Sequence, residues 1–407
     1  MAMARPSYIM FPNLRRISFD AEDHPEAITI CVPFMHPPIL EFEILIPDSV
    51  EDVSHYGRSQ LRFVLESIPR MCLLQRLSIC GAHDILTILP TFPEILKQLM
   101  TLRKLILPRY AMQSNIIEAL ALAPMLEDLC THADFRMCST SSKPLRLSLP
   151  SGSFPSLRKL TLFTDSRSIE HFLIHHPFIA CKLEILKLEL DEIDGTSLEQ
   201  ATCAVSRTCE KLRELSISKR IVDDNDLPDH LLPMPLCSLS STLALPDLTG
   251  LHISHLSCPP DIIDEDLDAL ALHIPAIEIL TLDIRPPGTE EVSKITLNAL
   301  AILARRCEKL QELKIYFNGR KTAALPTNPS PFKSLQCFSP SRSFVSDPYS
   351  VAFFLALVLP VGCKLQVEVE PISSWDQIKN LMPLLMRMRT VAIQDVMSGL
   401  GSNRKDL

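Results

Sequence analysis

One six-residue pattern, Leu-x-x-Leu-x-Leu with isoleucine or valine substituting for leucine, recurs along this chain of 407 residues and constrains its fold more than any other feature. Leu74 and Leu365 mark two copies that lie ten steps and 291 residues apart, so the mean period is about 29 residues. An internal period of this length indicates a stacked array of similar structural units rather than two or three ordinary domains. The copies begin at Leu14, Leu74, Leu102, Leu126, Leu157, Leu183, Leu212, Leu248, Ile277 and Leu310, with weaker ones at Leu335, Leu365 and Met388.

Each copy ends in an apolar-polar-apolar alternation, which is the period of a β-strand with one buried face. Between the copies, apolar residues recur at helical spacing, as at Ile169, Phe172 and Leu173. Periods of about 20–29 residues built from a strand and a helix are typical of leucine-rich repeats. The sequence therefore predicts an α/β fold: a leucine-rich-repeat solenoid (horseshoe) with irregular repeats, a parallel β-sheet on the concave face and helices on the convex face.

The domain organisation expected from this array is simple. A short N-terminal segment, 1–10, precedes a solenoid over 11–397, and a polar tail follows over 398–407. Within the solenoid, a proline-rich insertion is expected at 223–246 and a loop at 318–332, because turn-forming residues cluster there.

Composition excludes several classes of function. A net charge of -8 argues against a partner such as nucleic acid or an anionic membrane surface. Only 10 glycines are present, and no glycine-rich phosphate loop is found. The longest apolar run, Val351–Val361, is too short to span a membrane and predicts a buried helix. The 13 cysteines include no C-x-x-C pair, which is typical of reduced thiols and predicts a cytoplasmic or nuclear location.

Three clusters carry side chains that could do chemistry, and each has a plainer interpretation. Cys209 and Cys307 stand where other repeats have proline, which indicates a packing position. His175-His176 precede Pro177 and predict a helix end rather than a metal site. The acidic residues from Asp264 to Asp268 favour a helix N-terminus. They do not indicate a calcium-binding EF-hand loop, because the glycine that such a loop requires is absent here. We therefore expect no catalytic residues, no metal and no cofactor, and a protein that is not an enzyme.

Partner-binding residues are expected on the polar strand positions, which point into the concave face of a leucine-rich-repeat sheet. The position before the second apolar residue of each copy is mostly basic in the N-terminal half and never basic from Ile185 to Cys337. We hypothesise that the basic part binds an acidic or phosphorylated protein segment; the alternative is an ordinary solvated strand surface. The candidate residues are Arg16, Arg76, Lys104, Asp128, His132, Lys159, Phe163, Lys187, Glu214, Glu312 and Tyr316.

The repeats resemble those of a known family. Cys209-Glu-Lys-Leu212 and Cys307-Glu-Lys-Leu310, with the openings Phe11-Pro-Asn-Leu14 and Phe154-Pro-Ser-Leu157, are similar to repeats of fungal F-box/leucine-rich-repeat proteins. The resemblance covers about residues 11–393. It implies the substrate-binding part of a ubiquitin-ligase receptor, with a protein substrate as partner.

The family's helical F-box, which docks an adaptor of a cullin ubiquitin ligase, is not found. Only ten residues precede Phe11, so adaptor and cullin are expected only if an upstream F-box exists. Two alternatives stay open: a binding scaffold unrelated to ubiquitin, and a leucine-rich-repeat protein that regulates a GTPase or another enzyme.

Overall fold

The structure is a computed structural model of the chain, and the fold is described for fourteen stretches of it. These are residues 11–21, 25–46, 55–81, 85–108, 111–132, 147–190, 195–219, 234–235, 245–256, 260–284, 293–320, 330–341, 343–367 and 373–402. Most of the expected insertion at 223–246, much of the loop at 318–332 and the segment 1–10 lie outside the described residues.

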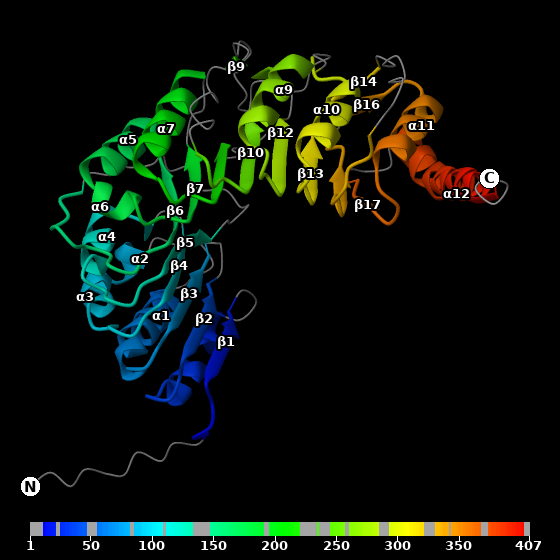
Figure 1. The fold of residues 1–407 in the computed structure, drawn as a ribbon. Helices are drawn as coiled ribbons and strands as arrows, with labels where there is room; N and C mark the ends of the chain where they lie inside the picture. Colours follow the sequence, from blue (N-terminus) through cyan, green and yellow to red (C-terminus); the bar gives the residue numbers. More distant parts are fainter. Residues whose placement is uncertain are drawn as a thin grey trace, which may run out of the picture. The chain divides into compact units, whose positions relative to one another are not determined.

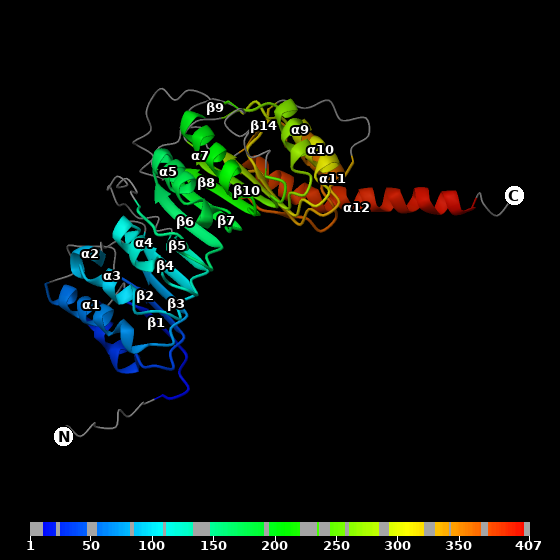
Figure 2. The same ribbon diagram turned by 60° about the vertical axis from the view of Figure 1, so that its left-hand side comes forward.

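The chain divides into two compact units. Unit 1 comprises Met1–Glu192 with the short stretches Arg207–Leu212 and Arg220–Asp226, and unit 2 comprises Ile193–Ser206, Arg213–Lys219 and Leu227–Leu407. Each unit is an α/β arrangement in which neighbouring strands are parallel and follow chain order. Helices pack on one face of the strands (Figures 1 and 2). The predicted α/β fold with a parallel sheet is confirmed.

The described part of unit 1 holds seven strands, paired in strict sequence order. They are β1 (Arg16–Asp20), β2 (Glu41–Leu45), β3 (Arg76–Cys80), β4 (Lys104–Pro108), β5 (Asp128–His132), β6 (Lys159–Thr164) and β7 (Ile185–Leu190). The helical segments between them are η1 (Pro25–Phe34), α1 (His55–Ser67), η2 (Ile68–Arg70), α2 (Ile85–Ile88), α3 (Phe92–Leu96), α4 (Ser114–Leu120), α5 (Ser166–His175) and α6 (Pro177–Ala180).

The residues described in unit 2 show the same alternation, with six further strands of the large sheet in chain order. They are β8 (Glu214–Lys219), β10 (Gly250–Leu256), β12 (Ile279–Ile284), β13 (Glu312–Ile315), β15 (Cys337–Ser339) and β17 (Lys364–Leu365). Two short pairs stand apart, β9 (Met234–Pro235) with β11 (Pro260–Asp261) and β14 (Asn318–Gly319) with β16 (Phe344–Val345). The helices are α7 (Gly195–Thr208, mostly in this unit), α9 (Asp264–His273), α10 (Asn298–Arg306), α11 (Pro348–Val358) and α12 (Ser373–Ser402).

A recurring backbone contact explains why neighbouring strands stack within each unit. The N–H groups of Arg103 and Lys104 both donate to the carbonyl of Gln75, at 2.8 and 2.9 Å, and the same pair of bonds recurs at the start of most strands. The following apolar residue then points into the core: Leu105 and Leu160 are 0% and 2% exposed. Because each strand can bury its apolar side only against its neighbours, the core runs continuously under each unit's strands.

Most of the expected helices are present. Helix α5 contains Ile169, Phe172 and Leu173, all buried as predicted, and Asp347 caps α11 by accepting hydrogen bonds from Tyr349 N and Ser350 N at 3.0 and 3.2 Å. Helix α12 runs to Ser402 and so includes the first residues of the segment expected to be a tail. Among the described residues, no helix is both long and apolar enough to cross a membrane.

Two details of the repeat assignment were wrong. Strand β2 was not predicted, because its pattern is Ile39-x-x-Phe42-x-Ile44 and has a phenylalanine at the central position. Leu365 pairs with Phe338 of β15, so it occupies the second apolar position of its repeat and not the first. The reason is physical: the core position needs a large apolar side chain, and Phe42 and Phe338, both 0% exposed, satisfy it as well as leucine does.

Candidate functional site

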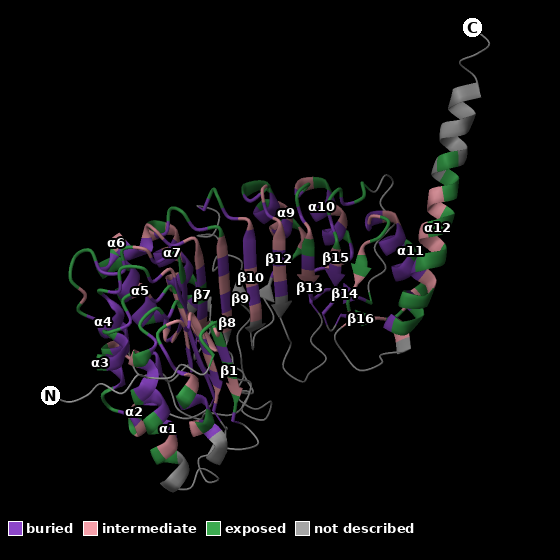
Figure 3. Cartoon of the chain, turned by 90° about the horizontal axis from the view of Figure 1, so that it is seen from below, coloured by how far each residue is buried: buried purple, intermediate pink, exposed green. Residues whose placement is uncertain are grey.

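The strand positions that alternate with the core residues form the second face of the sheet, which we call the open face. In Figure 3 the residues at these positions are intermediate or exposed along several strands, whereas the alternate ones are buried. The register aligns the first such position across unit 1. It is occupied by Arg16, Glu41, Arg76, Lys104, Asp128, Lys159 and Ile185.

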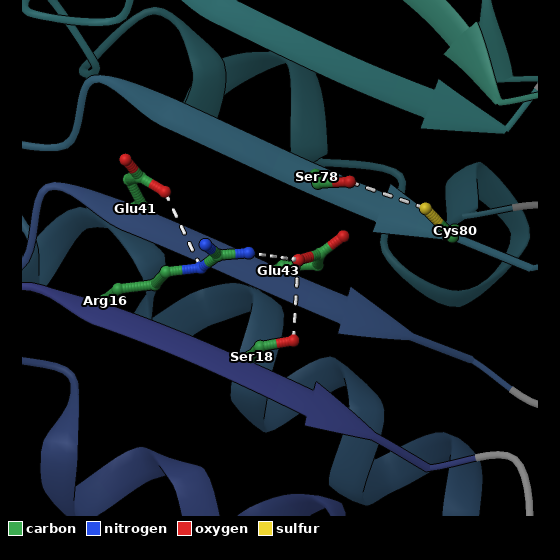
Figure 4. Close-up of polar contacts among 6 residues, drawn as sticks. All are labelled: Arg16, Ser18, Glu41, Glu43, Ser78 and Cys80. Carbon is green, nitrogen blue, oxygen red and sulfur yellow. Dashed lines mark hydrogen bonds and ion pairs between the residues drawn. The ribbon is translucent and has the colours of Figure 1, made fainter.

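Strand β2 changes the electrostatics at the N-terminal end of this row. Arg16 on β1 lies 3.6 Å from Glu41 and 3.3 Å from Glu43, measured between guanidinium nitrogens and carboxylate oxygens (Figure 4). Ser18 also donates to Glu43, at 3.4 Å. The side chain of Arg16 is 60% exposed, so these pairs contribute little stability, yet they neutralise its charge.

Lys104 is neutralised in the same way. Its Nζ lies 2.6 Å from Oδ2 of Asp128, whose side chain is only 12% exposed. The thiol of Cys130 donates to the other oxygen of Asp128 at 2.7 Å. Burial, and secondarily the neighbouring carboxylate, raises the pKa of Cys130 to about 11, so it stays a neutral thiol at physiological pH and is a poor nucleophile. Asp128 is 9% exposed, so its carboxylate binds neighbouring residues of the chain and has little surface left for a partner.

The row is therefore less basic in the structure than its sequence indicates. Glu41 and Asp128 alternate with the basic residues along the row, and the cations Arg16 and Lys104 are ion-paired. Arg76 and Lys159 differ, because no hydrogen bond or ion pair of their side chains occurs among the residues that the structure describes. They lie three strand spacings apart, which is about 14 Å.

The remaining candidates of unit 1 lie further along the strands. Lys187 on β7 is exposed and stands beside Thr161 of β6. His132 ends β5 and Phe163 is the fifth residue of β6, and both are half-buried. Each of these three residues already interacts with another part of the chain. The structure thus places them on the open face, further along the strands than the row that begins at Arg16.

In unit 2 the open face is less basic, as the sequence indicates. Glu214 on β8 lies 3.9 Å from Nε2 of His252, and Nδ1 of His252 is 3.0 Å from the hydroxyl of Thr281. Glu312 on β13 is exposed. The first-position row ends with Lys364 on β17, beyond Cys337, so the C-terminal half does contain one basic residue in this row.

Tyr316 was wrongly assigned to this face. Strand β13 ends at Ile315, so strand alternation no longer sets the direction of the next side chain. Tyr316 is 3% exposed, its carbonyl accepts a hydrogen bond from Ser293 at 3.3 Å, and burial raises the pKa of its phenol. It is a core residue.

The cysteine and acidic clusters that could do chemistry instead take part in packing and in helix ends. Cys209 and Cys307 are buried, and burial raises the pKa of each to about 12. The acidic segment begins α9 as predicted: Asp264 accepts from Thr296 N at 2.8 Å, and Asp268 binds the guanidinium of Arg306 at 2.8 Å. The latter contact lowers the pKa of Asp268. Among the described residues, no group of three histidine, cysteine or acidic side chains is placed to hold a metal ion.

Comparison with known proteins does not assign the chain to a family. The sequence matches no protein-family model, and no curated protein is similar to it. The open face is therefore interpreted from its own residues.

Proposed function

We propose that this chain is a leucine-rich-repeat-type module that binds another protein through the open face of its sheet. The observation that carries the proposal is the alignment of charged and polar side chains, in register, over consecutive parallel strands of unit 1. A rigid sheet presents such side chains at fixed spacing, which suits recognition of an extended surface better than catalysis.

Within that face, Arg76 and Lys159 are the proposed anchors for an acidic or phosphorylated segment. Arg16 and Lys104, in the same row, form ion pairs with carboxylates of the same chain. The N–H donors of Arg76 and Lys159 are therefore the ones available to a partner. Two negative groups about 14 Å apart would match them. The basic surface expected from the sequence is thus reduced to two side chains, Arg76 and Lys159.

The biological role we propose is that of the substrate-binding part of an F-box-type ubiquitin-ligase receptor. It rests on the resemblance of the Cys209 and Cys307 repeats to that family. A scaffold unrelated to ubiquitin, or a regulator of a GTPase or another enzyme, would use the same face and is separated from it by the proteins that co-purify.

The test is quantitative affinity purification of the tagged chain from its own cells. The wild-type chain is compared with Arg76→Glu/Lys159→Glu and with a matched control, Lys211→Glu/Lys309→Glu, which reverses two exposed turn lysines. Proteins lost only from the first variant identify the partner of the open face. Equal recovery in all three would refute the role of Arg76 and Lys159.

A second version, extended through any upstream reading frame, tests the ubiquitin-ligase role. Recovery of the adaptor and cullin with the extended version supports that role. If neither version recovers them while a partner still binds, the scaffold or the regulatory function takes its place.

A further inference from the structure

Unit 2 carries a groove at its C-terminal end, lined by the turn before β17 and by helix α12. Its volume is about 440 Å³, within the range of about 300–1,000 Å³ usual for ligand-binding clefts. The open face of the sheet contributes little to it. The lining residues are Leu359, Val361, Gly362, Cys363 and Leu365 from the turn and strand, and Lys379, Met382, Pro383, Met386, Arg387 and Thr390 from α12.

The packing of α12 explains why the groove is there. Trp375, Ile378 and Met382 are buried and hold the helix against the rest of unit 2. Further along, Arg389 donates to the carbonyls of Ala356 and Leu359 at 2.7 and 2.9 Å, at the end of α11. These contacts fix α12 beside the turn and leave one flank of the helix facing it across the groove.

The chemistry of the groove is apolar with positive ends. Val361, Leu365 and Met386 line it, and Lys379 and Arg387 stand on the α12 side. No acidic residue is among the lining residues, and neither cation has an ion pair or side-chain hydrogen bond in the part of the chain that the structure describes. A complementary ligand therefore combines an apolar group with negative charges.

The exposure of the groove favours a polypeptide over a small molecule. Pockets for small ligands usually enclose most of the ligand, but Val361 is 68% exposed and both cations are exposed. Lys379 and Arg387 are eight residues apart on a helix, which is about 12 Å. Residues four positions apart in an extended chain are about 13 Å apart.

We propose that this groove binds an extended segment of another protein, in which two acidic residues four positions apart flank a central apolar residue. The apolar side chain lies on Val361 and Met386, and the carboxylates pair with Lys379 and Arg387. This site is separate from the open face, so it adds a second contact with the same partner or a contact with a different one.

The experiment uses the full chain and a fluorescein-labelled peptide, Gly-Ser-Glu-Ser-Leu-Ser-Glu-Ser-Gly, with binding followed by fluorescence anisotropy. The expected result is saturable binding that Lys379→Glu/Arg387→Glu weakens about tenfold or more, since two charge-assisted contacts become repulsive. Val361→Asp, at a position exposed enough to fold normally, should weaken binding as well. Peptides with serine for the leucine, or glutamine for both glutamates, should bind poorly.

Two controls locate the site. Lys211→Glu/Lys309→Glu makes the same change of charge elsewhere, and Arg76→Glu/Lys159→Glu alters only the open face; both should bind the peptide like the wild type. Loss of binding in the open-face variant would overturn the proposal without touching the proposed function. So would absence of peptide binding, or binding of dodecanoate alone with the same dependence on Lys379 and Arg387, which would assign the groove to a small amphipathic anion.

Discussion

The single tryptophan of the chain gives a sharp test of how α12 is held. Trp375 is 1% exposed, its indole N–H donates to the carbonyl of Ser343 at 2.8 Å, and its ring meets Phe317 edge-on with centroids 6.2 Å apart. Trp375→Ala removes the whole ring from a closed core and should lower the free energy of unfolding by about 3–5 kcal/mol. Trp375→Phe keeps a ring but leaves the Ser343 carbonyl without its donor, which should cost about 1–3 kcal/mol.

The measurement is urea unfolding followed by circular dichroism, with the slope of free energy against urea compared between variants. Tyr349→Ala is the control, because that side chain is 67% exposed and its loss should change stability by less than about 0.5 kcal/mol. In the wild type, the emission of Trp375 reports unfolding around α12 alone, so it should shift to the red with the transition that the variants lower. A cost below about 1 kcal/mol for Trp375→Ala would refute the packing described for α12.

Three further predictions concern unit 1. Gly81 has φ +130°, and a Cβ there would lie 2.4 Å from the carbonyl oxygen of Ile46, so Gly81→Ala should lower the thermal midpoint by several degrees. Leu160→Ala should cost about 2–5 kcal/mol in urea unfolding, whatever its effect on binding. Burial, with a smaller effect of His175, lowers the pKa of His176, so its neutral form is favoured in the fold; stability should fall as pH drops below about 6.5. His176→Phe should flatten that loss in acid denaturation, whereas His175→Gln should not.

The fold could be predicted because its requirement is simple and repeated. Every strand must place a large apolar side chain against those of its neighbours, as Leu105, Leu160 and Leu186 do on three of the strands. The apolar run Val351–Val361 predicted a buried helix, and α11 begins just before it, where Asp347 satisfies the first N–H groups. Helix α10 begins only at Asn298, because the preceding residue Ile295 accepts a hydrogen bond from the N–H of Asn318 at 2.8 Å and belongs to the connection.

The candidate site was less predictable, because its properties depend on pairs of residues far apart in the sequence. The interpretation of a basic surface needed only single residues such as Arg16 and Lys104, and those residues do lie on the open face. Whether a cation is available to a partner depends on its neighbour across the strand, and Asp128 lies 24 residues beyond Lys104. The groove beside α12 could not be predicted either, since Lys379 and Val361 meet only through the packing of that helix.

Strand β2 shows how one substitution in a repeat motif changes a functional interpretation. With Phe42 accepted as equivalent to leucine, the sequence itself places Glu41 and Glu43 on the open face between Arg16 and Arg76. Missing one strand therefore leaves the fold prediction intact, because the array is unchanged in kind, but alters the sign pattern of the surface. Core positions tolerate any apolar side chain of suitable size, whereas a charged face depends on each residue in the row. The fold of a repeat protein can consequently be predicted when most of its repeats are recognised, whereas the charge pattern of its surface can be predicted only when every repeat is recognised.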